Sequence, residues 1–431
     1  MVVSLSPDYY RSMPFVSARR ATSGGLGLGL VVAVIGCAGS APPLPPEHAQ
    51  PLAHKPVTAT EAPTPSPQAG PAWAAATTSP RPGSTPDPEL AAAEEACGVG
   101  DASLHEVAQW LAEHFNEHPA AVVIDYANFH LRRTGSPYVM PRLWSAQMSP
   151  LDGKVVGESV GPWARQRPPL GEFRCGVGAA PLDDGTFAVI VLQADVLADV
   201  DALPTSSPSG TWLEFEADML VPATDAKLLL LPPAGLPRTL ATKLEGSTIK
   251  ARLPIETSGT WLVQLMATVS GGPRPVAQMY VTADEPLPSA PDERPVPGEE
   301  SIAPDQDTED ALLAAINGAR QELNLPAVRR NRKLDHVARQ HSEQMRKQGR
   351  ISHDSGHGDP AYRVENAGIR PKATGENVAL AASAVRLHRA LWASPSHREN
   401  MLLRRWDEVG VAVAEGEGGL LYATQLFIDS D

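Results

Sequence analysis

Apolar residues recur at helical spacing in several stretches of the chain. The sets are Leu104, Val107, Leu111 and Phe115; Leu312, Ile316, Ala319 and Leu323; Leu334, Val337, Ala338, His341 and Met345; and Ala384, Leu387, Leu391 and Trp392. Steps of three and four residues place each set on one face of a helix. The pattern predicts amphipathic helices that pack against another layer. Gly349 follows the third set, as is typical after a helix C-terminus.

Other apolar runs predict strands. Phe173–Ala179 and Phe187–Leu192 flank an Asp-Asp-Gly turn and predict a hairpin. Between Ser209 and Ala283, a series of short strand-like runs separated by Pro, Gly and Ser predicts a small β-sandwich. Near the C-terminus, Val409–Val413 alternates, and Tyr422–Ile428 returns after an EGEGG turn. Helices that precede an antiparallel hairpin indicate an α+β domain at this end.

The N-terminus has the features of an export signal. Arg19 and Arg20 precede Gly24–Gly36, an uncharged apolar run of 13 residues. This run is too short to span a bilayer, which takes about 20 residues, and it fits a cleavable signal. The run ends in VIGC at Cys37, which resembles a bacterial lipobox. It predicts a lipidated Cys37 that anchors the chain in the envelope, and an ordinary apolar run with a chance cysteine is the alternative.

The amino acid after the cysteine and the overall charge refine the location. Ala38 is not an aspartate, which favours the outer membrane if the cell has one. The expected location is the outer membrane or the extracellular face. The net charge of −14 argues against a general nucleic-acid binder, which needs a basic surface. It also argues against electrostatic attachment to anionic lipids.

Two further cysteines, Cys97 and Cys175, remain if Cys37 carries lipid. An even pair in an exported, oxidising compartment predicts a disulfide between them, with two free buried thiols as the alternative.

Composition divides the chain into six segments of a multi-domain α+β protein. The 43 prolines concentrate in two stretches that cannot bury enough apolar surface to fold. The expected segments are a lipoprotein signal peptide (1–37), a disordered Pro/Ala-rich stalk (38–96), an α+β unit (97–203), a β-sandwich (204–285), a linker (286–307) and a C-terminal domain (308–431).

The last segment carries a family resemblance. It contains AAINGARQELNLPAV, LDHVARQHSEQM, ISHD, GENVA, WASPSHRENML, VGVAV and YATQLF in this order. In order and spacing these motifs resemble a bacterial CAP domain (SCP-like), of the superfamily of cysteine-rich secretory, antigen 5 and pathogenesis-related 1 proteins. The resemblance implies an α-β-α sandwich with an open cavity.

The resemblance also implies a site. His353 of ISHD, Glu376 of GENVA and His397 of PSHRENM match cavity residues that bind a divalent metal in many members. Pro395 stands where many eukaryotic members have a second acid, so that tetrad is incomplete here. Two imidazoles and a carboxylate are a plausible three-ligand zinc set with an open position. The same residues would serve as catalytic acid and base, or each would make only local structural hydrogen bonds.

Some neighbouring polar residues have simpler interpretations. His357 and Asp354 belong to HDSGH, which Gly356 interrupts, so we interpret it as a solvated loop. His341 lies on an apolar stripe and is expected to be a hydrogen-bonded core histidine. Glu399 follows Ser396 at capping-box spacing and is expected to cap the short helix.

These features favour an exported lipoprotein whose CAP domain binds an envelope or extracellular ligand, such as a lipid, a glycan or a peptide. The alternative is a metal-assisted hydrolase of peptide or another envelope polymer that uses His353, Glu376 and His397. No nucleophile elbow or phosphate-binding loop is present in the sequence.

The first α+β unit resembles the last. LHEVAQWLAEHF at Leu104 parallels LDHVARQHSEQM at Leu334, and each unit ends in a hairpin of similar pattern. We hypothesise a degenerate CAP-like domain, which lacks a match to ISHD, GEN or SPSHR. The alternative is an unrelated α+β domain.

Overall fold

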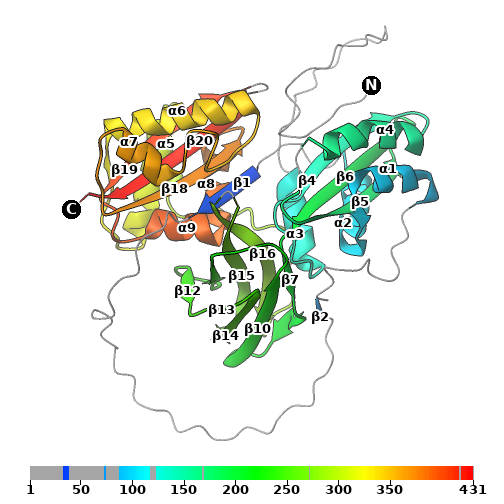
Figure 1. Cartoon of the computed structure of the whole chain (residues 1–431), viewed down its shortest axis with the longest axis horizontal. Coiled ribbons are helices and arrows are strands. Elements are labelled where there is room, and N and C mark those ends of the chain that lie inside the picture. Colours follow the sequence, from blue (N-terminus) through cyan, green and yellow to red (C-terminus); the bar gives the residue numbers. More distant parts are fainter. Residues whose placement is uncertain are drawn as a thin grey trace, which may run out of the picture.

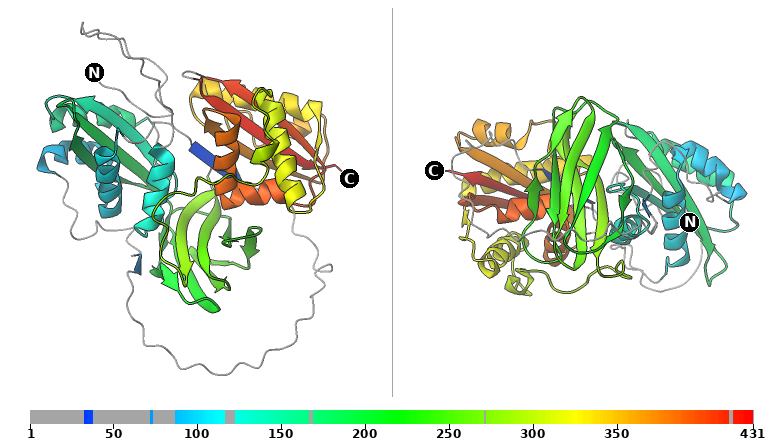
Figure 2. Two further views of the ribbon diagram at one scale, coloured as in Figure 1. Left: turned by 180° about the vertical axis from the view of Figure 1, so that it is seen from behind. Right: turned by 90° about the horizontal axis from the view of Figure 1, so that it is seen from below.

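The computed structural model describes residues 87–116, 123–166, 169–270, 272–416 and 419–430, together with the backbone of the short strands Ala33–Cys37 (β1) and Ala72–Trp73 (β2). The described residues form a mixed α+β protein of three folded units (Figure 1). The β-sandwich lies between the other two units in the view from below (Figure 2). Within the described part of the chain, the helices are too short or too polar to cross a membrane.

The first unit is a sheet covered by helices on both faces. Its helices are η1 (Pro88–Leu90), α1 (Ala91–Cys97), α2 (Ala102–Glu113), α3 (Val123–Arg133) and α4 (Gly153–Ala164), and its strands are β3 (Val99–Gly100), β4 (Arg142–Met148), β5 (Glu172–Pro181) and β6 (Phe187–Val196). The strand order is β3-β5-β6-β4. Leu143 and Leu192 pack with α2 on one face, whereas Trp144 and Val191 pack with α1 and α4 on the other.

The second unit consists of two packed sheets, in the orders β13-β14-β10-β7 and β12-β11-β15-β16-β9. Its strands are β7 (Ala198–Val200), β8 (Leu203–Pro204), β9 (Ser206–Ser207), β10 (Thr211–Met219), β11 (Asp225–Leu231), β12 (Arg238–Leu240), β13 (Lys243–Glu245), β14 (Thr248–Ile255), β15 (Gly259–Val269) and β16 (Gly272–Ala283). Phe215, Leu253, Trp261 and Met279 meet in one apolar core between the sheets. The expected β-sandwich is therefore present.

The C-terminal unit is an α-β-α sandwich. Its elements are α5 (Thr308–Glu322), β17 (Arg329–Arg330), α6 (Arg332–Gln348), α7 (Pro360–Asn366), β18 (Ala373–Ala381), α8 (Ala384–Ala393), α9 (Pro395–Leu402), β19 (Glu408–Glu415) and β20 (Leu421–Asp429). The strand order is β1-β18-β20-β19-β17. Helices α6 and α7 pack on one face of the sheet, and α5, α8 and α9 pack on the other.

The first and last units have the same connectivity. Each runs helix, short strand, two helices, strand, one or two helices and a hairpin. The sheet orders β3-β5-β6-β4 and β17-β19-β20-β18 correspond strand by strand, including the parallel pairing of β3 with β5 and of β17 with β19. Two unrelated domains that shared only a helix-then-hairpin pattern would not need to have the same strand order or the same parallel strand pair.

Local contacts repeat as well. Asp101 caps α2 and its N–H donates to the Cys175 carbonyl, while Asn331 caps α6 and its N–H donates to the Val409 carbonyl. These matched contacts support the hypothesis that the first unit is a degenerate copy of the last.

Two glycines repeat in the same way. A Cβ at Gly176 would lie 2.0 Å from the Leu104 carbonyl carbon, and a Cβ at Gly410 would lie 2.3 Å from that of Leu334. In both units glycine therefore lets the central helix approach the hairpin closely.

The expected boundary of the stalk at residue 96 is wrong. Leu90 and Ala93 are buried in the first unit's core, because η1 and α1 pack against α4. Glycines at 153 and 157 leave no side chain in the way of the backbone at 89 and 92. Strand β2, also in the expected stalk, pairs with β8. The rest of the stalk, and the expected signal apart from β1, lie outside the described residues.

Two other expected boundaries also shift. Strand β7 belongs to the sandwich, because it pairs with β10, so this unit starts before residue 204. The expected linker 286–307 is packed rather than free. Its short helix η3 (Glu299–Ser301) lies against α5, and Glu299 accepts two hydrogen bonds from Arg389 of α8.

The predicted disulfide between Cys97 and Cys175 is confirmed. It joins the end of α1 to β5, with a Cα–Cα distance of 5.8 Å across a sequence separation of 78 residues. A crosslink that closes so long a loop restricts the unfolded chain, which is worth about 4 kcal/mol in the chain-entropy estimate.

We therefore expect Cys97→Ala/Cys175→Ala to lower the free energy of unfolding of the first unit by about 4 kcal/mol. Urea unfolding followed by hydrogen exchange of β5 and β6 measures this. The unmodified protein in reductant serves as the matched comparison and should behave like the double variant. Equal midpoints with and without the disulfide would contradict the expectation.

Candidate functional site

The carboxylate of Glu376 lies at the centre of a buried charged cluster. Its two oxygens accept hydrogen bonds from Arg363 Nη2 at 3.0 and 2.8 Å. His353 Nδ1 lies 2.8 Å from the Glu376 Oε1 atom, and His341 Nε2 lies 3.7 Å from it. The structure thus brings together His353 and Glu376, as expected, and adds Arg363 and His341 to them.

The sheet and two helices position this cluster. Glu376 stands on β18, which lies between β1 and β20, and it is opposite Leu426 of β20. The alternation of strand residues turns its side chain towards α6 and α7. Asp359 caps α7, which carries Arg363. Arg363 Nη2 also donates to the His353 carbonyl at 3.0 Å, and His341 Nε2 lies 2.7 Å from the Ser352 carbonyl. The loop that bears His353 is therefore tied to both helices.

Electrostatics keep Glu376 ionised. Burial by itself would raise the pKa of its carboxyl, but Arg363, His341 and the hydrogen bond from His353 outweigh burial and lower the pKa to about 2. Burial lowers the pKa of His341, and this effect outweighs the negative charge of Glu376, which by itself would raise that pKa. The cluster is a buried, compensated ion pair, and its carboxylate is a weak base.

His397 lies in α9, on the other face of the sheet. Its side chain is fully buried. Its carbonyl accepts a hydrogen bond from Asn377 Nδ2 at 3.1 Å, and Asn377 Oδ1 in turn accepts one from Asn400. His397 is thus anchored to the residue next to Glu376. Convergence of the His397 ring with His353 and Glu376 stays a prediction.

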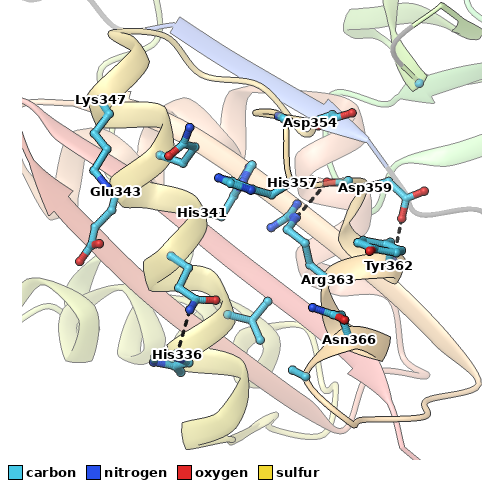
Figure 3. A pocket seen from close by; sticks show the side chains of 17 residues that line it. His336, His341, Glu343, Lys347, Asp354, His357, Asp359, Tyr362, Arg363 and Asn366 are labelled. Atoms are coloured by element: carbon cyan, nitrogen blue, oxygen red, sulfur yellow. Dashed lines mark hydrogen bonds between the residues drawn. The ribbon is translucent and has the colours of Figure 1, made fainter.

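A groove of about 1340 Å³ opens over this cluster, between α6, α7 and the loop that joins them (Figure 3). His341 and Arg363 line it, and polar side chains surround them, among them His336, Glu343, Asp354, His357 and Asp359. Tyr362 stands at its rim with 59% of its surface exposed. The HDSGH segment is therefore part of a groove wall.

Arg363 and Tyr362 are not among the site residues expected from the sequence. Both lie in AYRVEN, which reads as a short polar helix. No feature of this segment in the sequence indicates that Arg363 is buried against Glu376.

The family match agrees with this architecture. Residues 313–427 match the family model described as the cysteine-rich secretory protein family, CAP. The C-terminal unit is a CAP domain.

Solved structures similar to the chain include three bacterial proteins. An outer surface protein from Borrelia burgdorferi shares 22% identity over 29% of this chain and 97% of its own, with a TM-score of 0.27. An extracellular SCP-domain protein from Bacillus anthracis shares 17% identity over 52% of this chain and 87% of its own, with a TM-score of 0.25. A cysteine-rich secretory protein from Staphylococcus aureus shares 14% identity over 54% of this chain and 82% of its own, with a TM-score of 0.24. None of the curated proteins compared with the chain matches it.

The side chains of the CAP domain do not fit a divalent metal as they are arranged. Among the described residues, no group of three His, Cys, Asp or Glu side chains is placed to hold an ion. Arg363 occupies both oxygens of Glu376, the one carboxylate of the expected set, and its positive charge would repel a cation there. A metal would first have to displace this guanidinium.

Glu399 does not cap α9, contrary to the expectation from its spacing. The N-cap residue is Ser394, and Glu399 instead reaches across to the β-sandwich. Its carboxylate accepts hydrogen bonds from Lys227 Nζ at 2.8 Å and Thr239 Oγ1 at 2.6 Å. Its partners on the sandwich, the charged Lys227 and the hydroxyl of Thr239, are the physical reason, since together they outcompete a local backbone N–H. The PSHRENM helix therefore docks the CAP domain onto the sandwich.

We expect Glu376→Gln to lower the free energy of unfolding by about 3 kcal/mol at pH 7, because a shift of pKa from 4.5 to about 2 carries this linkage energy. The folded-state pKa lies below the unfolded value. The contribution is therefore complete above about pH 4.5 and is lost as the pH falls towards 2. Denaturant unfolding of both proteins between pH 7 and pH 3 measures the difference.

Glu343→Gln is the matched control, since Glu343 is exposed on α6. It should change stability by less than about 0.5 kcal/mol at either pH. A Glu376→Gln effect that stays constant down to pH 3 would show that ionisation of Glu376 is not its source.

Proposed function

We propose that this protein is an exported lipoprotein whose CAP domain binds an extracellular glycan in the groove between α6 and α7. The observation that carries the proposal is a set of hydrogen-bonding groups at the floor of this groove. Arg363 Nη1 and His341 Nδ1 are buried and have no hydrogen-bond partner within the described part of the chain. Buried polar atoms are normally paired, so these two favour a ligand rich in hydroxyl and carbonyl oxygens.

The chemistry of the walls agrees with a glycan better than with a lipid. The groove is lined mainly by charged and amide side chains, with Val337 and Ala367 as small apolar patches. Tyr362 offers an exposed aromatic ring with a polar tip at the rim. A ring of this kind suits the C–H face of a sugar, while the polar walls suit its hydroxyl groups.

Glu376 supports binding rather than hydrolysis. Its carboxylate is fully buried and held by Arg363 and His353, and its pKa of about 2 makes it a poor proton acceptor near neutral pH. The alternative function, a metal-assisted hydrolase with His353, Glu376 and His397, would require Arg363 to leave the carboxylate. In the binding mode, the ion pair instead holds the floor of the groove in one shape.

The proposed location rests on the N-terminal sequence. The apolar run that ends at Cys37 would direct export and lipidation, and the Pro/Ala-rich segment after it would hold the folded units away from the membrane. Cleavage of the signal before Cys37 would remove β1 from the CAP sheet and leave β18 at its edge. The Cys97–Cys175 disulfide is in keeping with an oxidising compartment. We propose that the anchor lies in the outer membrane or on the outer face of the cell.

A glycan-binding assay tests the proposal. Oligosaccharides released from bacterial envelopes are labelled and titrated with the purified protein, and binding is read by fluorescence anisotropy. We expect saturable binding that Tyr362→Ala weakens at least tenfold, because it removes the aromatic rim. Added chelator should leave binding unchanged.

Trp212→Ala is the matched control, because Trp212 is an aromatic residue of the sandwich with 56% of its surface exposed. It should bind like the unmodified protein. Equal affinity of the Tyr362→Ala variant, or binding to neutral lipid vesicles and to no glycan, would contradict the proposal.

A further inference from the structure

A second cavity, of about 680 Å³, lies where the three folded units meet. Helix α3 of the first unit, strands β15 and β16 of the sandwich, residues 291–297 and helices α8 and α9 of the CAP domain all contribute to its wall. The α6–α7 groove shares none of these lining elements except β16. This cavity is therefore separate from the proposed glycan site.

Arg398 of α9 brings an uncompensated positive charge to the cavity wall. Its Nε donates to the Trp392 carbonyl at 2.6 Å, and its guanidinium carbon lies 4.5 Å from the centre of the Trp392 ring. Among the described residues, no carboxylate forms an ion pair with it. Burial lowers its pKa to about 10. A partly buried guanidinium without a counter-charge is costly, and an anion would offset that cost.

Gln278 of β16 supplies an unused donor to the same wall. The side chain is only 5% exposed. Its Oε1 accepts a hydrogen bond from Arg132 Nη2 at 2.9 Å, which fixes the orientation of the amide. Its Nε2 is buried and has no partner in the part of the chain that the structure describes. An acceptor in the cavity would satisfy this group.

The two groups lie on neighbouring parts of the wall. Gln278 stands directly opposite Gln264 in the β15–β16 ladder. Gln264 Oε1 accepts a hydrogen bond from the Ser396 N–H at 3.1 Å, and Ser396 is two residues from Arg398 in α9. The sandwich and the CAP domain thus meet along a short chain of contacts that joins both donors.

The other charges of the cavity are largely compensated. Arg389 pairs with Glu299, and Arg294 pairs with Asp292. Asp125, another lining residue, lies within the electrostatic reach of Arg386 and Arg132. Glu293 is the remaining lining acid, and neither it nor any other described carboxylate forms an ion pair with Arg398.

We propose that this cavity binds an organic anion, with its carboxylate at Arg398 and Gln278 and its apolar or aromatic body along the wall. Phe129, Leu262, Tyr280 and Trp392 provide the apolar surface. A single carboxylate matches the donor set, since it supplies two acceptor oxygens and one negative charge. A ligand held here touches all three units and stabilises their arrangement.

Dansylglycine and its uncharged analogue dansylglycinamide test the proposal with the exported chain. Both carry the same aromatic body and differ only in the carboxylate. We expect dansylglycine to bind at one site per chain with enhanced fluorescence, and the amide to bind at least tenfold more weakly. Arg398→Gln should weaken dansylglycine binding at least tenfold, and Arg398→Lys should recover part of the loss.

Arg404→Gln is the matched control, because Arg404 is exposed just beyond α9. It should bind like the unmodified protein, as should Tyr362→Ala, which alters only the glycan groove. Gln278→Glu keeps the size of the side chain and places a negative charge at the cavity wall, so it should also weaken binding at least tenfold. This variant provides the test if Arg398→Gln fails to fold. Equal affinity for acid and amide, or unchanged binding in the folded Arg398 or Gln278 variants, would overturn the proposal.

Discussion

The buried carboxylate of Glu376 is the charge around which the CAP domain is arranged. A lone carboxylate on a fully buried strand would be prohibitively costly, so helix α7 must bring Arg363 to it and the loop after α6 must bring His353. The same guanidinium holds the carbonyl of His353 and lines the groove. One ion pair therefore fixes a helix, a loop and the shape of the proposed ligand site.

The first unit shows the same fold without this charge. In β6, Leu192 stands opposite both Gly176 and Leu143, just as Leu426 of β20 stands opposite both Gly410 and Glu376. Leu143 therefore occupies the position of Glu376, and it is buried in the core. A buried leucine at this position needs no ion-pair or hydrogen-bond partner. The first unit can therefore keep its sheet and helices although it lacks ISHD, GEN and SPSHR. The fold itself therefore does not require a charge at this position.

Sequence patterns predicted the elements whose causes are local. The helical stripe that includes Leu334 and the alternation at Val409–Val413 both form as expected, because burial of one face decides them. Arg363 was missed because its partner Glu376 belongs to another element, 13 residues further on, and nothing in AYRVEN signals burial. The expectation for Glu399 was wrong because a capping-box spacing can be recognised in the sequence, whereas a contact with Lys227 on another domain cannot. Helix α1 was overlooked for a similar reason, since it is held by packing against α4, which the glycines at 153 and 157 allow to approach closely.

The most direct test of this account is a crystal structure of the protein grown with zinc and measured for anomalous scattering. We expect Arg363 to remain on both oxygens of Glu376, with no metal between Glu376 and His353. A zinc ion coordinated by His353, Glu376 and His397, with Arg363 displaced, would contradict the account and restore the metal-assisted alternative.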